Sequence, residues 1–289
     1  MLIANCFKGT LRSIRIIAID WSGAAVGAAR RIWLAEASPP DTLLRLESGR
    51  ARGQMAEHLL ARIEQQPHVA IGLDFAFSFP HWFLRELGVS SAHELWALTE
   101  ARGEDLLRAC EPPFWGRKGR SRPPLIEQFR QTEHALRQRG VWPKSVFQIG
   151  GAGAVGTGSI RGMPLLHRLH EAGARIWPFD PPGWPLVLEI YPRLFTPAVV
   201  KSSAAARSAY LQRHFSQLAP WQIQTEDAFD AAISALVMAR HVADFQALPA
   251  AANPVEQLEG RIWQPEGLNF APWQSSQHRR RPLSRRRAR

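Results

Sequence analysis

Cysteine and tyrosine are both scarce in this chain of 289 residues, which contains two of each. Cys6 and Cys110 are too few and too far apart to form a disulfide framework or a cysteine-rich zinc site. The ten histidines show no metal-ligand spacing, and no serine–histidine or cysteine–histidine arrangement indicates nucleophilic catalysis. This use of cysteine is typical of a reducing compartment, and we expect a cytoplasmic protein.

Long apolar runs are also missing. No stretch approaches the roughly 18 apolar residues of a membrane span, although 45% of the chain is hydrophobic. Residues 1–14 contain Lys8 and Arg12 but not the apolar core of a signal peptide, so we interpret them as an N-terminal extension. The sequence therefore predicts a protein with a sizeable core and no membrane segment. It does not indicate the oligomeric state.

The end of the chain lacks acids. Seven arginines lie in residues 277–289, and they leave +4 of the formal net charge of +11 to the rest of the chain. We interpret residues 266–289 as a disordered basic tail. Such a tail can bind the phosphate backbone of a nucleic acid by counterion release, or it can be a solvated end without a partner.

Two apolar runs end in a carboxylate. Four apolar residues precede Asp20 in residues 15–20, and a similar run in residues 69–74 ends at Asp74. Continuous apolar runs of this length are typical of strands buried on both faces of a sheet. An ionised carboxylate at the end of such a strand is costly unless a cation, a donor or a metal compensates it. We therefore expect Asp20 and Asp74 to meet at one edge of a sheet.

Three further strands complete the predicted sheet. Residues 31–37 and 42–46 extend the first strand as a meander. In residues 186–191, alternation places Glu189 on the face opposite the leucines. A glutamate inside an apolar strand is explained either by a functional site shared with the other two acids or by a salt bridge to an arginine such as Arg193.

Helical periodicity marks residues 53–66 and 226–245. In the second helix, Asp227 and Asp230 are three residues apart and share a face. Asp227 lies in the first turn, where the helix dipole favours acids whatever their function. Asp230 flanks the apolar side and is the better functional candidate. Glu57, in the first helix, points away from the core and is a poor one.

Residues 80–144 interrupt the strand–helix pattern, and we interpret them as a helical insertion. Helices are predicted at residues 91–110 and 125–139. The loop between them carries an aromatic pair and several basic residues, including Arg117 and Lys118. Such a loop can contact a phosphate backbone, or it can be only a soluble surface turn.

Residues 150–159 are rich in glycine and contain a formal G-x-G-x-x-G at Gly151, Gly153 and Gly156. In a dinucleotide-binding unit, a helix begins within this motif. Here we expect the next helix only at residues 164–172. We therefore predict a flexible loop that brings backbone close to a substrate, rather than a dinucleotide site.

Taken in order, five short blocks resemble the domain-of-unknown-function family 429 (DUF429), which is regarded as a family of predicted nucleases with a ribonuclease H-like fold. The blocks are Ile-Asp20-Trp-Ser-Gly, Gly-Leu-Asp74-Phe-Ala-Phe-Ser, Phe-Gln148-Ile-Gly-Gly, Leu-Glu189-Ile-Tyr-Pro192 and Asp227-Ala-Phe-Asp230-Ala. The resemblance implies an α/β fold, with a ribonuclease H-like mixed sheet flanked by helices. It implies one domain over residues 15–265, interrupted by the helical insertion.

The resemblance also implies a site for Mg²⁺ or Mn²⁺ and nucleic acid as the partner. In two-metal hydrolysis, ions about 4 Å apart activate water and stabilise the leaving oxygen of a phosphodiester. Such hard cations prefer oxygen ligands. The implied catalytic and metal-binding acids are Asp20, Asp74, Glu189 and Asp230, with Asp227 as a further metal ligand. The residues expected to contact the substrate are Ser22, Gln148, Gly151, Gly153, Arg117 and Lys118.

Two alternative functions stay open. The same fold builds sugar kinases and actin-like ATPases, so a nucleotide-dependent phosphotransferase is one, although those enzymes use two such domains and this chain has room for one. A non-catalytic nucleic-acid-binding protein is the other. It would keep the fold and the basic tail but pair each acid with an arginine. The positions of the carboxylates distinguish these alternatives from a nuclease.

Overall fold

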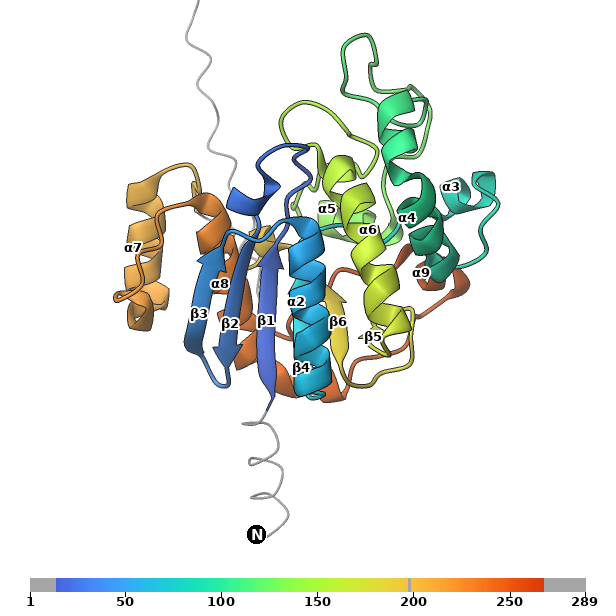
Figure 1. Cartoon of the computed structure of the whole chain (residues 1–289). Helices are drawn as coiled ribbons and strands as arrows, with labels where there is room; N and C mark the ends of the chain where they lie inside the picture. The colour runs from blue at the N-terminus through green and yellow to red at the C-terminus, as the bar shows by residue number, and fades with distance from the viewer. Residues whose placement is uncertain (1–13, 197–198, 268–289) are drawn as a thin grey trace, which may run out of the picture.

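The computed structural model describes residues 14–196 and 199–267. Residues 1–13 of the predicted extension and the predicted tail from residue 268 onward lie outside the described residues, whereas Ile14 is buried in the core. The described residues form a six-stranded sheet with the order β3-β2-β1-β4-β6-β5 (Figure 1). The strands are β1 Arg15–Asp20, β2 Trp33–Ser38, β3 Thr42–Ser48, β4 Val69–Leu73, β5 Arg175–Ile176 and β6 Leu186–Glu189.

The sheet is mixed. β2 runs antiparallel to β1 and β3, which confirms the predicted meander. β4 runs parallel to β1, and β6 runs parallel to both β4 and β5. In the ladder, Ile19 of β1 pairs with Leu73 of β4. Asp20 and Asp74, one residue further along each strand, therefore reach the same edge of the sheet.

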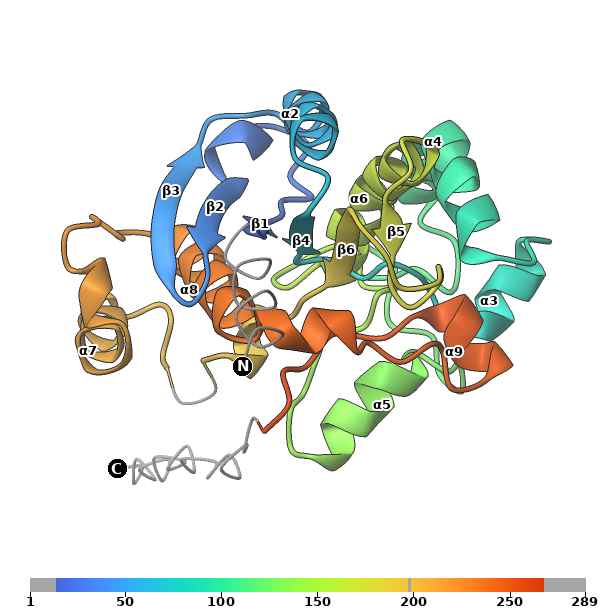
Figure 2. The same ribbon diagram turned by 90° about the horizontal axis from the view of Figure 1, so that it is seen from below.

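Helices cover both faces, so the predicted α/β architecture of a mixed sheet flanked by helices is confirmed. α2 (Arg52–Gln65) and α6 (Val155–Glu171) lie on one face, and α8 (Glu226–Arg240) lies on the other (Figure 2). The buried odd-numbered residues of β1 and β4 pack with α2 and α6, and the buried even-numbered alanines and isoleucine pack with α8. By this alternation, Asp20 and Asp74 belong to the face that α8 covers.

Further helices lie at the two ends of the sheet. α7 (Ala204–His214) lies beyond β3, at the end of the sheet opposite the insertion (Figure 1). The predicted insertion contains α3 (His81–Glu86), α4 (Ala92–Ala109) and α5 (Gln131–Gln138), and α9 (Pro254–Glu259) packs against all three. Short 3-10 helices span Ala28–Arg30, Pro192–Leu194, Ser216–Leu218 and Val242–Gln246.

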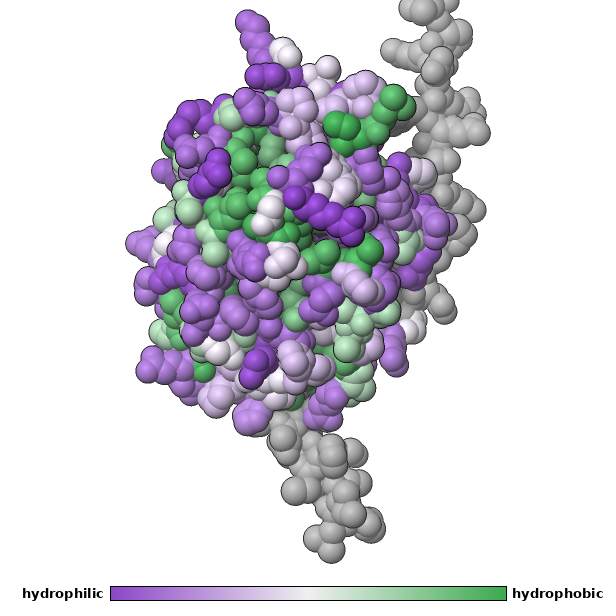
Figure 3. Space-filling model, turned by 90° about the vertical axis from the view of Figure 1, so that its right-hand side faces the viewer, coloured by the Kyte–Doolittle hydropathy of each residue, from purple (hydrophilic) through white to green (hydrophobic). Residues whose placement is uncertain are grey.

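An aromatic core supports the insertion. The rings of Phe79, Phe83, Phe114 and Phe147 lie with their centroids 5.2–5.8 Å apart, and Trp82 joins them. On the side of the molecule that carries these helices, an apolar area is framed by hydrophilic side chains (Figure 3). α4 packs along α6, which itself lies on one face of the sheet. The insertion is therefore packed against the rest of the domain.

Two helices begin at other residues than the sequence predicted. α5 begins at Gln131 rather than at residue 125, because Leu125 follows two prolines and adopts a left-handed φ of +60°. α6 begins at Val155, well before the predicted start, and continues through Pro164. The second difference matters for function, because it brings the start of a long helix to the glycine-rich segment.

We expect Gly72→Ala to destabilise the fold by about 1–3 kcal/mol, the usual effect of overpacking. A Cβ atom at Gly72 would lie 2.6 Å from Met238 Sδ and 2.9 Å from Ile190 Cγ2, so α8 could not keep its close approach to β4. The free energy of unfolding in urea measures this. Gly53→Ala is the matched control, because nothing lies within 4 Å of its Cβ position in α2. Equal effects of the two substitutions would contradict tight packing of α8 on β4.

Candidate active site

Asp20 and Asp74 meet at the carboxyl ends of β1 and β4. Asp20 is the last residue of β1, and Asp74 directly follows β4. The backbone N–H of Asp74 donates to the carbonyl of Ile19 at 3.1 Å, which continues the ladder past the end of the strand. The two carboxyl groups are close enough for each to shift the pKa of the other. The structure thus brings together Asp20 and Asp74, the two acids that follow the apolar runs in the sequence.

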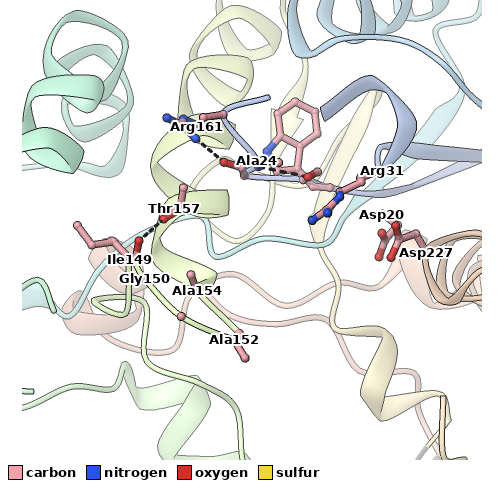
Figure 4. Close-up of a pocket in the computed structure, with 16 residues that line it drawn as sticks. Asp20, Ala24, Arg31, Ile149, Gly150, Ala152, Ala154, Thr157, Arg161 and Asp227 are labelled. Carbon is pink, nitrogen blue, oxygen red and sulfur yellow. Dashed lines mark hydrogen bonds between the residues drawn. The ribbon is translucent and has the colours of Figure 1, made fainter. Parts of the chain in front are cut away.

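Helix α8 adds two carboxylates to this pair. Thr225 caps the helix, and the apolar side of the helix packs on the sheet. Asp230 therefore faces the ends of the strands, within electrostatic range of both Asp20 and Asp74. Asp227, one turn earlier, lies near Asp20 (Figure 4). We call Asp20, Asp74, Asp227 and Asp230 the acid cluster.

Lys201 supplies a cation to the acid cluster. Its Nζ lies 2.7 Å and 2.8 Å from the two carboxylate oxygens of Asp230. Both side chains are mostly buried, with exposed fractions of 14% and 15%. Within residues 14–196 and 199–267, no ion pair joins Asp20 or Asp74 to a basic side chain. The positive charge at the site is thus smaller than the negative charge that the four acids can carry.

Burial and mutual repulsion favour protonation of the acid cluster. Burial, reinforced by the charges of Asp74, Asp230 and Asp227, raises the pKa of Asp20 well above its ordinary value. Burial and the charge of Asp230 raise the pKa of Asp74 to about 7. Burial also raises the pKa of Asp230, although Lys201 opposes it. A cation that enters the cluster would relieve this repulsion, so the site is electrostatically prepared for one.

Without added metal, we expect the free energy of unfolding to fall as the pH rises from about 4, the ordinary pKa of an aspartate, to about 7. The sign follows from linkage: the folded protein holds the proton of Asp74 more tightly than the unfolded chain does, so deprotonation costs stability. Urea unfolding in EDTA across this range measures the slope. Asp74→Asn should have a flatter slope than wild type, and parallel curves would contradict the assignment.

Glu189 does not join the acid cluster. It pairs with Leu73 in the ladder, one position before Asp74, so its side chain leaves the opposite face of the sheet. There its carboxylate oxygens accept from Arg130 at 2.5 Å and 2.8 Å, and one also accepts from the Phe77 N–H at 2.9 Å. Glu189 is within electrostatic range of Asp74 and lines a smaller cavity with it, but Arg130 binds its carboxylate, so Glu189 does not converge with the other acids as a free ligand. The alternative of a salt bridge to an arginine is correct, with an arginine of the insertion as the partner.

Arg130 has a structural role here. Its side chain is fully buried and also donates to Glu133 at 2.8 Å and 3.0 Å and to the Glu259 carbonyl at 3.1 Å. Burial opposes the charge, but the carboxylates of Glu133 and Glu189 outweigh it and raise the pKa of Arg130 above its ordinary value. The guanidinium therefore stays charged, and it keeps Glu189 from acting as a free metal ligand.

A cavity of about 690 Å³ opens beside the acid cluster. Asp20 and Asp227 lie at one end of it, and residues 150–154 and the first turn of α6 lie at the other (Figure 4). Arg31 is exposed and extends into the space between them. Within the described residues no ion pair engages Arg31. The cavity thus joins carboxylates that can hold a cation to groups that can hold an anion.

The glycine loop, residues 150–154, leads directly into α6. Gly151 and Gly153 line the cavity with φ angles of +74° and +77°, which favour glycine. Because α6 begins at Val155, the positive end of its dipole faces the cavity, although the N–H groups of its first turn already donate to the carbonyls of Gly153, Gln148 and Ala154. The expected late start of this helix was wrong, and with it the argument against a dinucleotide site that rested on that late start.

Two other features still argue against a dinucleotide-binding unit. The segment before the glycine motif is not a strand of the sheet, and only Gln148 forms a bridge, to Trp115. The acid after β5, Asp180, is bound by His93 and His170 and is not free to hold a ribose. A helix start beside a glycine loop is therefore present, but the dinucleotide-binding unit around it is not.

The other predicted substrate contacts differ in their positions. Ser22 lines the cavity. Gln148 supports the loop instead of facing a substrate, because its side-chain amide donates to the carbonyls of Gly150 and Ala152 at 3.2 Å and 3.0 Å. Arg117 and Lys118 are exposed and do not line the cavity. Their loop nevertheless lies beside the cavity wall, because Gly116 packs directly on Gly150.

Sequence reasoning missed Lys201, Arg130 and Arg31. Each is a single basic residue in a loop or next to a strand, without a motif around it. Their roles become clear only from their surroundings in the structure. Lys201 pairs with Asp230, Arg130 pairs with Glu189, and Arg31 lines the cavity. The one available signal was general, since buried acids require compensating cations.

Comparisons with known proteins found no matching family model, curated protein or solved structure. The resemblance to the domain-of-unknown-function family 429 therefore stays a prediction from the sequence blocks. None of the helices in the described part of the chain has both the length and the apolar character needed to cross a membrane.

Proposed function

We propose that this protein is a metal-dependent nuclease, which hydrolyses phosphodiester bonds at the acid cluster. One observation carries the proposal. Asp20 and Asp74 end adjacent parallel strands, and both lie within electrostatic range of Asp230 of α8, which Lys201 contacts. These acids lie within electrostatic range of one another, and carboxylates with raised pKa values beside a cavity are typical of functional sites.

The topology supports a ribonuclease H-like fold as part of this proposal. A meander of β1, β2 and β3 continues into parallel strands, with helices on both faces. The acids stand at the ends of β1 and β4 and on a late helix, which is the distribution that the sequence resemblance implies. The argument for chemistry comes from the site and not from the fold, because one fold serves many functions.

The acid cluster offers the ligand type that Mg²⁺ or Mn²⁺ prefers, although among the described residues only His93, His170 and Asp180 place three ligand atoms within 4.8 Å of one another. The candidate ligands are Asp20, Asp74 and Asp230, with Asp227 beside them, and all offer only oxygen, which these hard cations prefer. When bound, the ions would supply Lewis acidity and an activated water for phosphodiester hydrolysis. Glu189 is left out of the ligand set, because Arg130 binds its carboxylate.

The rest of the cavity fits a phosphate backbone. Arg31 can pair with a phosphate, and the positive end of the α6 dipole lies beside Gly151 and Gly153. Arg161, which also lines the cavity, is bound by Glu104 at 2.6 Å and contributes less charge. We therefore place the scissile phosphodiester at the acids and the neighbouring backbone along this wall, so the proposed substrate is a nucleic acid.

The proposal is tested with labelled DNA and RNA oligonucleotides, single-stranded, duplex and branched, incubated with Mn²⁺, Mg²⁺ or EDTA. We expect cleavage in either metal and none in EDTA. ATP turnover without cleavage of any oligonucleotide would favour the phosphotransferase. Salt-dependent binding without either reaction would favour a non-catalytic nucleic-acid-binding protein. Either outcome contradicts the nuclease.

We expect Arg31→Met to weaken oligonucleotide binding for all sequences and to lower the slope of log affinity against log salt by about 1, the effect of losing one phosphate contact. Fluorescence anisotropy in Ca²⁺ at several salt concentrations measures this. Arg30→Met is the matched control, because Arg30 is an exposed neighbour that does not line the cavity. Equal losses in both variants would show a general charge effect and not a contact at Arg31.

A further inference from the structure

A second group of ligand-type side chains lies away from the acid cluster. His93, His170 and Asp180 each offer one ligand atom, and these atoms lie within 4.8 Å of one another. His93 is in the first turn of α4, His170 is in the last turn of α6, and Asp180 follows β5. The three residues thus come from three segments that only the fold brings together. We call them the His–Asp cluster.

The ligand atoms of the His–Asp cluster converge. His93 Nε2 lies 3.0 Å from one carboxylate oxygen of Asp180, and His170 Nδ1 lies 3.3 Å from the other. The two imidazole rings are tilted against each other, with their centroids 4.1 Å apart and their planes at 36°. Ligand atoms about 2.0–2.2 Å from a tetrahedral zinc ion are separated by similar distances.

The surroundings hold these side chains in place. Asp180 accepts a hydrogen bond from the backbone N–H of Ile176 at 2.8 Å, and its side chain is 6% exposed. Trp96 is fully buried and presents its ring edge-on to His93 at 4.9 Å. Preorganised ligands of this kind lose little freedom when a metal binds, as supporting contacts in known metal sites illustrate.

We propose that the His–Asp cluster binds a divalent transition metal of the zinc class. Two imidazoles and a carboxylate suit zinc, cobalt or nickel, whereas magnesium and calcium prefer oxygen alone. The imidazoles are 32% and 28% exposed, so a metal ion and a water in the fourth position can reach the site. The site would hold the start of α4, the end of α6 and the edge of the sheet together, without depending on the acid cluster.

Binding requires a proton rearrangement that the geometry allows. Without metal, the ring nitrogens that face Asp180 donate to its carboxylate, so each carries a proton. With metal, those nitrogens must be free of protons. Each imidazole can then carry its proton on the far nitrogen, His93 Nδ1 or His170 Nε2. For these two atoms the described part of the chain provides no hydrogen-bond partner, and solvent can accept from them.

The test titrates the EDTA-treated full-length protein with Zn²⁺ by calorimetry and with Co²⁺ by visible absorption, in the Asp20→Asn background so that the acid cluster does not interfere. We expect one zinc to bind and tetrahedral cobalt bands to appear. His93→Gln and His170→Gln should each weaken zinc binding by about tenfold or more and remove the cobalt bands. Asp180→Asn is a less suitable variant, because Asp180 also accepts from Ile176.

His167→Gln is the matched control. His167 lies on the same helix as His170, is similarly exposed at 26%, and contacts Glu100 rather than the His–Asp cluster. Its zinc affinity and cobalt spectrum should equal those of the parent. Equal zinc affinity in His93→Gln, His170→Gln and the parent, or the absence of cobalt bands in the parent, would overturn the proposal. The contacts of Asp180 with the two histidines would then be hydrogen bonds or ion pairs only.

Discussion

Replacing Asp20 with asparagine should abolish both the stabilisation by Mn²⁺ and the hydrolysis of phosphodiesters. Asp20 lies within electrostatic range of Asp74, Asp227 and Asp230, so its loss removes a candidate ligand from the centre of the acid cluster. Bound metal contributes several kcal/mol to such reactions, so cleavage should fall about a thousandfold or more. Thermal unfolding with and without Mn²⁺ and a cleavage assay measure the two effects.

The same substitution should stabilise the metal-free protein, by about 1 kcal/mol, because it removes one charge from a group of acids that repel one another. A substitution that lowers stability in Mn²⁺ but raises it without metal identifies a metal ligand. A residue that only supports the fold would lower stability in both conditions. Asp105→Asn is the control, since Asp105 is a 64% exposed acid on α4, and it should change neither quantity. A wild-type protein whose melting temperature does not respond to Mn²⁺ would remove the basis of the nuclease proposal.

Arg130→Met should be the most destabilising single substitution, at about 3–5 kcal/mol. It would leave the carboxylates of Glu133 and Glu189 buried without their cation, and such uncompensated charges cost far more than the ion pair itself contributes. Urea unfolding measures the loss. Arg108→Met should change stability by less than about 1 kcal/mol, because its pair with Asp105 is exposed.

A double substitution tests whether uncompensated charge causes the destabilisation by Arg130→Met. Arg130→Met leaves two buried carboxylates without a cation, and adding Glu189→Gln removes one of them. The double variant should therefore recover part of the stability that Arg130→Met loses. Additive losses in the double variant would contradict the charge explanation and indicate lost packing instead. Neither residue belongs to the acid cluster, so stabilisation by Mn²⁺ should persist in any of these variants that folds.

The sequence predicted the acids of β1, β4 and α8 because their signals are local. An apolar run that ends in aspartate specifies a buried strand and the position of its carboxylate, and helical spacing specifies the side of Asp230. For Glu189 the decisive facts are not local. Pairing with Leu73 selects the face of the sheet, and the partner Arg130 lies 59 residues away in the chain. No pattern within the strand contains that information.

The start of α6 was mispredicted because its glycines were interpreted as breaks. In the structure they permit close packing: a Cβ atom at Gly156 would lie 2.1 Å from the Val146 carbonyl oxygen, and one at Gly162 would lie 2.6 Å from the ring of Phe75. Tertiary contact therefore outweighs the low helix propensity of glycine here. The His–Asp cluster could not be predicted from the sequence for a related reason. His93 and His170 are brought together only by the fold and show no metal-ligand spacing along the chain.

The contacts of Arg130 also determine how the molecule should unfold. The insertion that carries Arg130 supplies the cation for the glutamate at the end of β6, and its α4 packs along α6. An insertion that detached on its own would take away the cation of Glu189 and the contacts between α4 and α6, so partial opening would cost stability. The insertion and the sheet should therefore form one cooperative unit, with coincident denaturation curves from tryptophan fluorescence and from circular dichroism.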